Sequence, residues 1–240
     1  MNNKPFLTAE WRNLLMANYA IDPAILKPYL PCFTELDTYE GTNYVSLVGF
    51  LFTNTRVAGI RFPFHHQFEE VNLRFYVRYK EAGEWKRGVV FMKEIVPRRM
   101  ITLVANTIYK ENYATHPMKH TWQEGEDTLD VAYYWKVGRD WNYLKASADK
   151  KAAPLQEGSQ EAFITEHYWG YTQVSDNCSG VYEVAHPKWN IHAVKDYEVH
   201  CNAAQLYGPA FADVLAAPPR SVFLADGSPI QVLKGGRIYS

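Results

Sequence analysis

The chain has 240 residues, of which 47% are hydrophobic, 15% aromatic and 21% charged, and its formal net charge at pH 7 is −1. This near-neutral charge gives no electrostatic footprint for nucleic acid or an anionic membrane surface, so neither partner is expected. The three cysteines are widely spaced and include no CxxC pair, which argues against a disulfide framework and a zinc site. The sequence has no leader-like or membrane-spanning apolar run, so no membrane span is expected. Together these features favour a cytoplasmic location.

The first part of the chain is predicted to contain a short helix and strands. Residues 5–18 end in an apolar cluster that fits either a strand or a helix. Asp22-Pro23 marks a helix start, with an N-cap acceptor followed by proline at the first helical position. Residues 44–53 are rich in β-branched and aromatic side chains and are predicted to form a strand. Residues 56–68 contain many breakers and are predicted to form a long loop that carries His65 and His66.

Residues 70–79 alternate strictly between polar and apolar side chains, which is the period of a β-strand. The apolar side chains would pack on a core. The polar ones, Glu70, Asn72 and Arg74, have two interpretations. Open solvent is the ordinary one for one face of an antiparallel sheet. The alternative places these three side chains along the wall of a wet cavity inside a small barrel.

Charge is concentrated in the next stretch, at the junction between a predicted strand and a predicted helix. Residues 88–95 form the strand, which carries Glu94 near its end, and Pro97, Arg98 and Arg99 follow. Apolar residues then recur at helical spacing, at Met100, Leu103, Val104, Thr107 and Ile108. Burying a carboxylate and two guanidiniums is costly unless they are paired, so this junction is a candidate site.

The second half is predicted to be mostly strand, interrupted by two helices. Strands are expected over residues 130–138, 168–175, 180–187 and 220–227. Ser159 can cap a short helix over residues 160–167, and a helix over 202–215 would be interrupted near Gly208-Pro209. The last strand is expected to turn at residues 226–229 into a C-terminal hairpin. Together these elements predict one domain over residues 1–240, mainly antiparallel β with a few α-helices.

The candidate site residues each have a structural and a functional interpretation. Glu94 either pairs with an arginine to lock strand to helix, or acts as a proton carrier while Arg98 and Arg99 hold a ligand oxygen. His167, beside Glu166, either ends a helix or forms an acid/base couple with that glutamate. His65 is a candidate ligand contact. GxSxG, GxGxxG and P-loop patterns are absent, and neither a metal ion nor a cofactor is expected.

Several runs resemble a known family. These are FLTAEWRNLLMANYAIDPAILKPYLP, TELDTYEGTNYVSLVGF, PFHHQFEEVNLRFYVR, GVVFMKEIVPRRMITLVAN, TEHYWGYT and SVFLADGSP, between Phe6 and about Pro229. They resemble the YqjF-like bacterial family of unknown function and, more remotely, the acetoacetate decarboxylase superfamily. The resemblance implies an antiparallel, cone-shaped β-barrel with a central cavity, and homo-oligomers as a superfamily expectation.

The resemblance also shows where this chain departs from the superfamily. There, a Glu is followed by Pro-Lys-Lys, whose first lysine forms a Schiff base with the substrate ketone. Here Glu94 and Pro97 match, but Arg98 and Arg99 stand at the lysine positions, and arginine is not a Schiff-base nucleophile. Either Glu69 or Glu70 resembles the superfamily's other acidic position.

The sequence therefore predicts a barrel that binds a small anionic or carbonyl metabolite in its central cavity. It would be a lyase-like enzyme without a Schiff-base lysine, with Glu94 and His167 as catalytic residues. The ligand would be held by Arg98, Arg99, Glu70, Asn72, Arg74 and His65. Two alternatives remain open: a non-catalytic binding or sensing protein, and a structural charge network without a ligand site.

Overall fold

Strands dominate the computed structural model, which describes residues 5–61, 66–108 and 111–239. The strands are β1 (Leu7–Ala20), β2 (Glu35–Leu36), β3 (Tyr44–Val57), β4 (Phe68–Glu81), β5 (Glu84–Val96), β6 (Tyr113–Thr115), β7 (Met118–Glu124), β8 (Thr128–Val137), β9 (Asp140–Asp149), β10 (Ala153–Pro154), β11 (Trp169–Ser175), β12 (Cys178–Ala185), β13 (Asn190–His200), β14 (Ser221–Val232) and β15 (Gly236–Tyr239). The helices are α1 (Pro23–Leu26), α2 (Arg99–Ile108), α3 (Gln160–Thr165), α4 (Ala203–Tyr207) and α5 (Ala212–Ala216), with 3₁₀ turns at Lys27–Tyr29 and Pro209–Phe211. Within the described ranges, none of these helices combines the length and the apolar character needed to cross a membrane.

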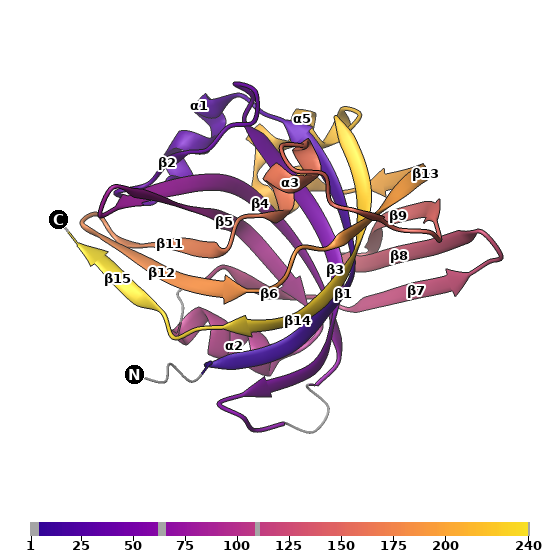
Figure 1. The fold of residues 1–240 in the computed structure, drawn as a ribbon, viewed down its shortest axis with the longest axis horizontal. Helices are drawn as coiled ribbons and strands as arrows, with labels where there is room; N and C mark the ends of the chain where they lie inside the picture. The colour runs from indigo at the N-terminus through magenta and orange to yellow at the C-terminus, as the bar shows by residue number, and fades with distance from the viewer. Residues whose placement is uncertain (1–4, 62–65, 109–110, 240) are drawn as a thin grey trace.

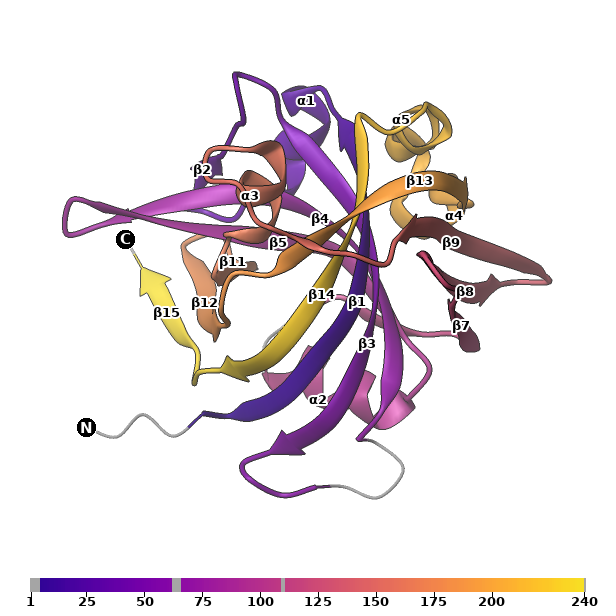
Figure 2. The same ribbon diagram turned by 45° about the vertical axis from the view of Figure 1, so that its right-hand side comes forward.

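A ring of paired strands forms the barrel. Its order is β12, β11, β5, β4, β3, β1 and β14, and β12 pairs with β14 to close the circuit. These pairings are antiparallel except for the short parallel contact between β5 and β11. The mainly β, cone-like fold predicted from the sequence is therefore confirmed. Figures 1 and 2 show α3 at one end of this barrel and α2 at the other.

A second layer of strands extends the sheet beyond the ring. β13 pairs with β14 over residues 191–193 and with β9 over residues 194–200, and β8 and β7 follow in order. Figure 1 shows these strands projecting to the right of the barrel. One apolar core, which includes Leu73 and Trp135, lies between the outer face of the barrel and this layer. A second core, which includes Met16 and Tyr76, fills part of the barrel interior.

Several predicted elements form as expected, each for an identifiable local reason. The Asp22 side chain accepts a hydrogen bond from the Ala24 amide at 2.8 Å and so caps α1. Ser159 caps α3 in the same way, because its hydroxyl accepts from the Ala162 amide at 3.1 Å. The predicted interruption near Gly208-Pro209 separates α4 from α5, since Gly208 has a φ of +103° that ends the first helix.

The C-terminal hairpin predicted at residues 226–229 is wrong. β14 runs through this segment without turning, and β15 pairs with β12 instead. Gly227, whose φ is +80°, lies opposite Arg12 of β1. The residue after Arg12, Asn13, also has a positive φ, of +54°. The glycine absorbs an irregularity in the β1–β14 pair, because a Cβ at this position would lie 2.0 Å from the Trp11 carbonyl oxygen.

Helix α2 is confirmed, but its predicted buried face is wrong at two positions. Met100 and Leu103 are 56% and 61% exposed. Contact with the barrel is made instead by Ile101, which packs on the interior core, and by Thr102, whose hydroxyl lies 2.7 Å from that of Thr115. The helix therefore covers the barrel end through a mixed polar and apolar face that hydrophobic spacing does not identify.

The polar face of β4 lies inside the barrel rather than in open solvent. Glu70 and Asn72 are each 2% exposed and Arg74 is 8% exposed. Their neighbours Val71 and Leu73 point the other way, into the core between the two layers. Both faces of β4 are buried because the strand is covered on one side by the barrel itself and on the other by the second layer. The open-solvent interpretation of this face is thus wrong, and the three side chains lie in the barrel interior.

Candidate functional site

Three glutamates that are close together in space lie buried in the barrel interior. Glu70 is on β4, Glu94 on β5, and Glu111 just before β6, and they are 2%, 2% and 8% exposed. Two tyrosines, Tyr113 and Tyr182, complete this group, which we call the carboxyl cluster. Carboxyl groups so close together and so deeply buried are costly for a fold, so the cluster is the leading candidate for a site.

A β-bulge in β5 places Glu94 in the cluster. Val89 and Phe91 point into the barrel, but the register with β4 shifts between Leu73 and Arg74, so the alternation of β5 is interrupted after Phe91. Beyond the bulge Glu94 points inward. Lys93 points outward, where its ammonium donates a hydrogen bond to the Leu206 carbonyl on α4. The bulge thus puts a carboxyl, and not the neighbouring amine, inside the barrel.

Helix α2 and strand β6 hold Tyr113 beside the glutamates. The Asn106 side chain on α2 accepts from the Tyr113 amide at 2.8 Å and donates to its carbonyl at 3.0 Å. β6 pairs in parallel with β5, which sets Tyr113 opposite Glu94. The Tyr113 hydroxyl then donates to Glu70 Oε2 at 3.2 Å and also hydrogen-bonds Glu94. One phenol therefore links two of the three carboxyls.

Burial raises the pKa of every carboxyl in the cluster. The pKa of Glu70 is raised from 4.5 to about 7, because burial outweighs the hydrogen bonds from Asn72 and Tyr113 and the charge of Arg74. The pKa of Glu111 is raised to about 8, again mainly by burial. Burial, together with the charges of Glu111 and Glu70, raises the pKa of Glu94 well above its usual range. The cluster therefore holds protons at pH 7, where exposed glutamates hold none.

Some polar atoms of the cluster lack a partner within the described part of the chain. These are Glu94 Oε2, Glu111 Oε1 and, beside them, the Asn72 carbonyl oxygen. Each such buried atom costs about 1–3 kcal/mol of folding free energy. A ligand with hydrogen-bonding groups at this place would offset part of that cost, which is the usual physical sign of a functional site.

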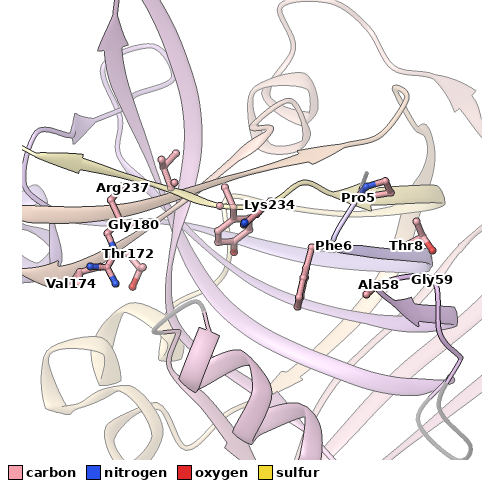
Figure 3. A pocket seen from close by; sticks show the side chains of 14 residues that line it. Pro5, Phe6, Thr8, Ala58, Gly59, Thr172, Val174, Gly180, Lys234 and Arg237 are labelled. Atoms are coloured by element: carbon pink, nitrogen blue, oxygen red, sulfur yellow. The ribbon is translucent and has the colours of Figure 1, made fainter. Parts of the chain in front are cut away.

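A cavity of about 790 Å³ lies at the end of the barrel near α2, and Tyr182 is the member of the cluster that lines it. It lies between the start of β1, the end of β3, the β11–β12 hairpin and the segment that joins β14 to β15. Tyr182 of β12 lines the cavity and hydrogen-bonds Glu111, so it connects the open space to the cluster. Gly170 of β11 makes room for this ring, because a Cβ there would lie 2.2 Å from Tyr182 Cζ. Figure 3 shows the cavity with Lys234 between its two groups of lining residues.

Arg74 lies along the same inner face of β4, toward α3. Its Nη2 donates to the Ile164 carbonyl at 3.2 Å, while its Nε has no partner among the described residues. Ile164 and Phe163 close the α3 end of the barrel with apolar side chains. Arg74 is thus a buried cation placed between the carboxyl cluster and the closed end.

His167 belongs to a different buried group, at the α3 end. Its Nε2 lies 3.1 Å from Asp37 Oδ2, and Arg87 donates to the same oxygen at 2.7 Å. Burial lowers the pKa of His167 to about 4, despite the hydrogen bond to Asp37. The pKa of Asp37 falls to about 2, because these hydrogen bonds outweigh the effect of burial. His167 packs on Tyr76 and Phe163 and is not brought to Glu94.

The structure therefore gathers some of the predicted site residues and separates others. Glu94, Glu70 and Asn72 come together, with Arg74 next along β4. Arg98 and Arg99 are exposed at the start of α2 and do not join them, because the chain leaves the barrel at Pro97. His65 lies outside the described residues.

Of the two neighbouring glutamates, Glu69 and Glu70, only one lies on the inner face of β4. Glu70 faces the interior, whereas Glu69 faces β7 and lies 2.7 Å from His120 Nδ1.

Glu111, Tyr113 and Tyr182 are the members of the cluster that were not predicted. Glu111 and Tyr113 follow α2 in a segment without a strong periodic pattern, and Tyr182 belongs to a strand whose inner face could not be identified. Within the described ranges, no three His, Cys, Asp or Glu side chains are grouped so that they could hold a metal ion.

Comparisons with known proteins agree with this architecture. Residues 8–229 match the model of the DUF2071 family, described as an uncharacterized conserved protein. The uncharacterized protein YqjF of Bacillus subtilis (strain 168) is 30% identical over 165 residues. That match covers 68% of this chain and 65% of YqjF, so it spans less than two thirds of that relative.

Solved structures of similar fold include three enzymes. Acetoacetate decarboxylase from Legionella pneumophila has a TM-score of 0.67 and 16% identity, covering 99% of this chain and 90% of its own. An acetoacetate decarboxylase-like enzyme from Sphingomonas wittichii RW1 has a TM-score of 0.65 and 13% identity, covering 99% and 94%. The enduracididine biosynthesis enzyme MppR, complexed with pyruvate, has a TM-score of 0.65 and 13% identity, covering 98% and 91%. At these identities the likeness establishes the fold and not the reaction.

Proposed function

Because this chain belongs to the DUF2071 family of uncharacterized conserved proteins and has an acetoacetate decarboxylase-like fold, we propose that it binds a carbonyl metabolite in the barrel and acts on it as a lyase-like enzyme that begins with a proton transfer. The observation that carries the proposal is the carboxyl cluster. It combines raised pKa values with polar atoms that lack partners, next to a cavity large enough for a metabolite.

The proposed chemistry is proton removal from the carbon next to the carbonyl. Glu70, whose pKa is about 7, accepts this proton as a carboxylate. The electron pair of the broken C–H bond forms the C=C bond of an enol, and the carbonyl oxygen takes a proton from the neutral carboxyl of Glu94. The enol can take a proton back at carbon from Glu70. Alternatively it returns its hydroxyl proton to Glu94 as the C=O bond re-forms, its C=C electrons move to the next C–C bond and expel a leaving group from the β-carbon, and Glu70 gives its proton to that group.

Tyr113 supports both glutamates in this scheme. Its hydroxyl contacts Glu70 and Glu94, so it keeps the acceptor and the donor at a fixed spacing and can pass a proton between them. The scheme needs no covalent lysine. Lys93 is held on the outer side of β5 by the Leu206 carbonyl, and the arginines at positions 98 and 99 are not Schiff-base nucleophiles.

Hydrogen–deuterium exchange into a panel of small ketones and keto acids, followed by proton NMR in D₂O, tests the proposal. We expect the protein to speed deuterium incorporation next to the carbonyl. Glu70→Gln and Glu94→Gln should each lower the rate by at least about a hundredfold, as expected for loss of a general acid or base. Glu69→Gln is the matched control, because its side chain faces away from the barrel, and it should exchange like the wild type.

The alternatives give different results in the same experiment. Ketones that bind without exchange would support a non-catalytic binding protein. Absence of both binding and exchange across the panel would support the interpretation of the buried charges as a structural network without a ligand site. Borohydride treatment with a bound ketone, followed by intact mass measurement, checks the covalent route, and a stable adduct on any lysine would contradict the proposed mechanism.

A further inference from the structure

The cavity has a distribution of charge that the carboxyl cluster does not explain. Among the described residues, the 14 that line it include two cations, Lys234 and Arg237, and no acid. Both cations are exposed; Lys234 lies between β14 and β15, and Arg237 lies on β15. Figure 3 shows Lys234 in the middle of the cavity wall and Arg237 on the side of the β11–β12 hairpin. The cavity wall is therefore positive at these two residues, while the acids of the carboxyl cluster lie beyond the wall, behind Tyr182.

The rest of the cavity wall is mostly apolar. Phe6 contributes from the start of β1, and Val174 and Val181 from the β11–β12 hairpin. A volume of about 790 Å³ is in the range of sites for drug-sized molecules and is much more than a ketone of three or four carbons fills. The wall thus suits a ligand with a sizeable apolar body.

The orientation of such a ligand follows from the charges of Lys234 and Arg237 on the cavity wall and from those of the carboxyl cluster. An anionic group placed beside Glu70, Glu94 and Glu111 would be repelled by any ionised carboxyl. A neutral carbonyl oxygen, in contrast, can accept from Tyr182 or from a protonated carboxyl. The anionic group of a ligand is favoured at Lys234 and Arg237, the two cations of the cavity wall.

We propose that Lys234 and Arg237 form a binding subsite on the cavity wall for an acidic group of an amphipathic carbonyl ligand. The apolar body lies against Phe6 and the β11–β12 hairpin, and the carbonyl reaches Tyr182. This inference rests on the proposed function, because it assigns the carbonyl end to the carboxyl cluster. It adds the ligand's second functional group and its approximate size.

Two aryl ketones that differ in one group test the subsite. The probes are 4-oxo-4-phenylbutanoate and butyrophenone, which share the phenyl ketone and differ in the carboxylate. Calorimetric titration at low ionic strength should show tighter binding of the acid. Lys234→Ala combined with Arg237→Ala should weaken the acid about tenfold and leave the neutral ketone unchanged, and added salt should weaken only the acid. Lys151→Ala, which removes an exposed lysine from outside the cavity, is the control and should change neither.

The possible failures of the inference and of the proposed function are distinguishable. If butyrophenone binds as tightly as the acid, or the double substitution weakens both equally, the anionic subsite is wrong while the carbonyl site stands. If neither probe binds to the wild type, both proposals fail for aryl ketones. If both bind and Glu94→Gln has no effect on either, the cavity binds these probes but the proposed role of the cluster is wrong. Melting temperatures of the variants check that each one is folded, which is expected because both cations are exposed.

Discussion

Glu69 and Glu70 are adjacent in the chain and meet opposite electrostatic environments. Glu70 faces the barrel interior, where burial raises its pKa to about 7. Glu69 faces β7, where burial would also raise the pKa, but the hydrogen bond with His120 outweighs it and the pKa is lowered. The two carboxyls therefore contribute to stability in opposite ways as the pH changes.

The carboxyl cluster should make the protein less stable as the pH rises from about 5 to 8. An unfolded chain loses these protons near the ordinary value of 4.5, whereas the folded chain keeps them up to about 7 at Glu70 and about 8 at Glu111. Rising pH across this window therefore favours unfolding, on the order of 1 kcal/mol per pH unit for each group. Melting temperatures of the wild type and of Glu111→Gln, measured from pH 5 to 8, should show a shallower decline in the variant.

Glu69→Gln provides the matched control with the opposite sign. A lowered pKa contributes stability that is present above about 4.5 and lost as the pH falls through the folded value. This variant should therefore be less stable than the wild type at pH 8 and should approach it at low pH. Parallel pH profiles for the two glutamine variants would contradict the assignment of the environments.

Gly170 is predicted to be essential for the position of Tyr182. A Cβ at this position would lie 2.2 Å from Tyr182 Cζ and 2.6 Å from its hydroxyl, so Gly170→Ala must displace the ring from Glu111. We expect a loss of about 1–3 kcal/mol of stability, typical of overpacking, and weaker ketone binding. Gly236→Ala is the control in the same cavity, because its Cβ would meet nothing nearer than Val181 Cγ1 at 3.8 Å. Equal binding by the two variants, measured by calorimetry, would show that Tyr182 is not part of the site.

At the scale of elements, the bulge in β5 decides which charged side chain enters the barrel. Regular alternation from Val89 and Phe91 would put Lys93 inside and Glu94 outside. The extra residue reverses this outcome, and no local signal in the sequence marks its position. This is why the charged junction could be located from sequence, while the direction of each of its side chains could not.

Predictions from sequence were most accurate where one local force acts. The strict alternation of β4, the caps at Asp22 and Ser159, and the break at Gly208 all have a local cause and were identified. The direction of the polar face of β4 was ambiguous, because alternation defines two faces and only the closure of the barrel determines what covers each. Tyr182 was missed for the same reason, since its partner Glu111 is 71 residues away in the chain.

The cap of α3 offers a test at this scale. Ser159→Ala removes the hydrogen bond to the Ala162 amide and should lower the free energy of unfolding by about 1 kcal/mol. Ser159→Asp keeps a capping acceptor and should remain close to the wild type. Urea unfolding followed by circular dichroism measures both. An alanine variant as stable as the wild type would mean that α3 is held mainly by Phe163 and Ile164 in the barrel end.

At the scale of the whole molecule, the barrel is closed by a short seam. β12 and β14 pair only at Val184–Val232 and Ala185–Gln231 among the described residues, and the Leu233 amide adds a bond to the Glu183 carbonyl at 2.9 Å. The pairing of β4 with β5, in contrast, spans residues 71–81 and 84–95. The ring is therefore unequal in strength around its circumference.

Hydrogen exchange followed by mass spectrometry should detect this inequality. We expect amides of the seam, such as Leu233, to exchange through local opening, and amides in the middle of β4 to exchange only on global unfolding. A ligand that bridges Lys234 and Tyr182 should slow exchange in the seam more than in β4. Equal protection of the two regions without ligand would show that the barrel opens only as a unit.

The late position of β14 in the chain also has a consequence for biosynthesis. β1 lies between β3 and β14 in the ring, so the strand made first cannot complete its pairing until β14, some two hundred residues later, has been translated. Until then the nascent chain exposes an unpaired edge of β1, and the glutamates of the carboxyl cluster remain in water. Such non-local pairing is slow and prone to aggregation. A chain that ends before β14 would therefore lack the strand that pairs with both β1 and β12 to close the barrel.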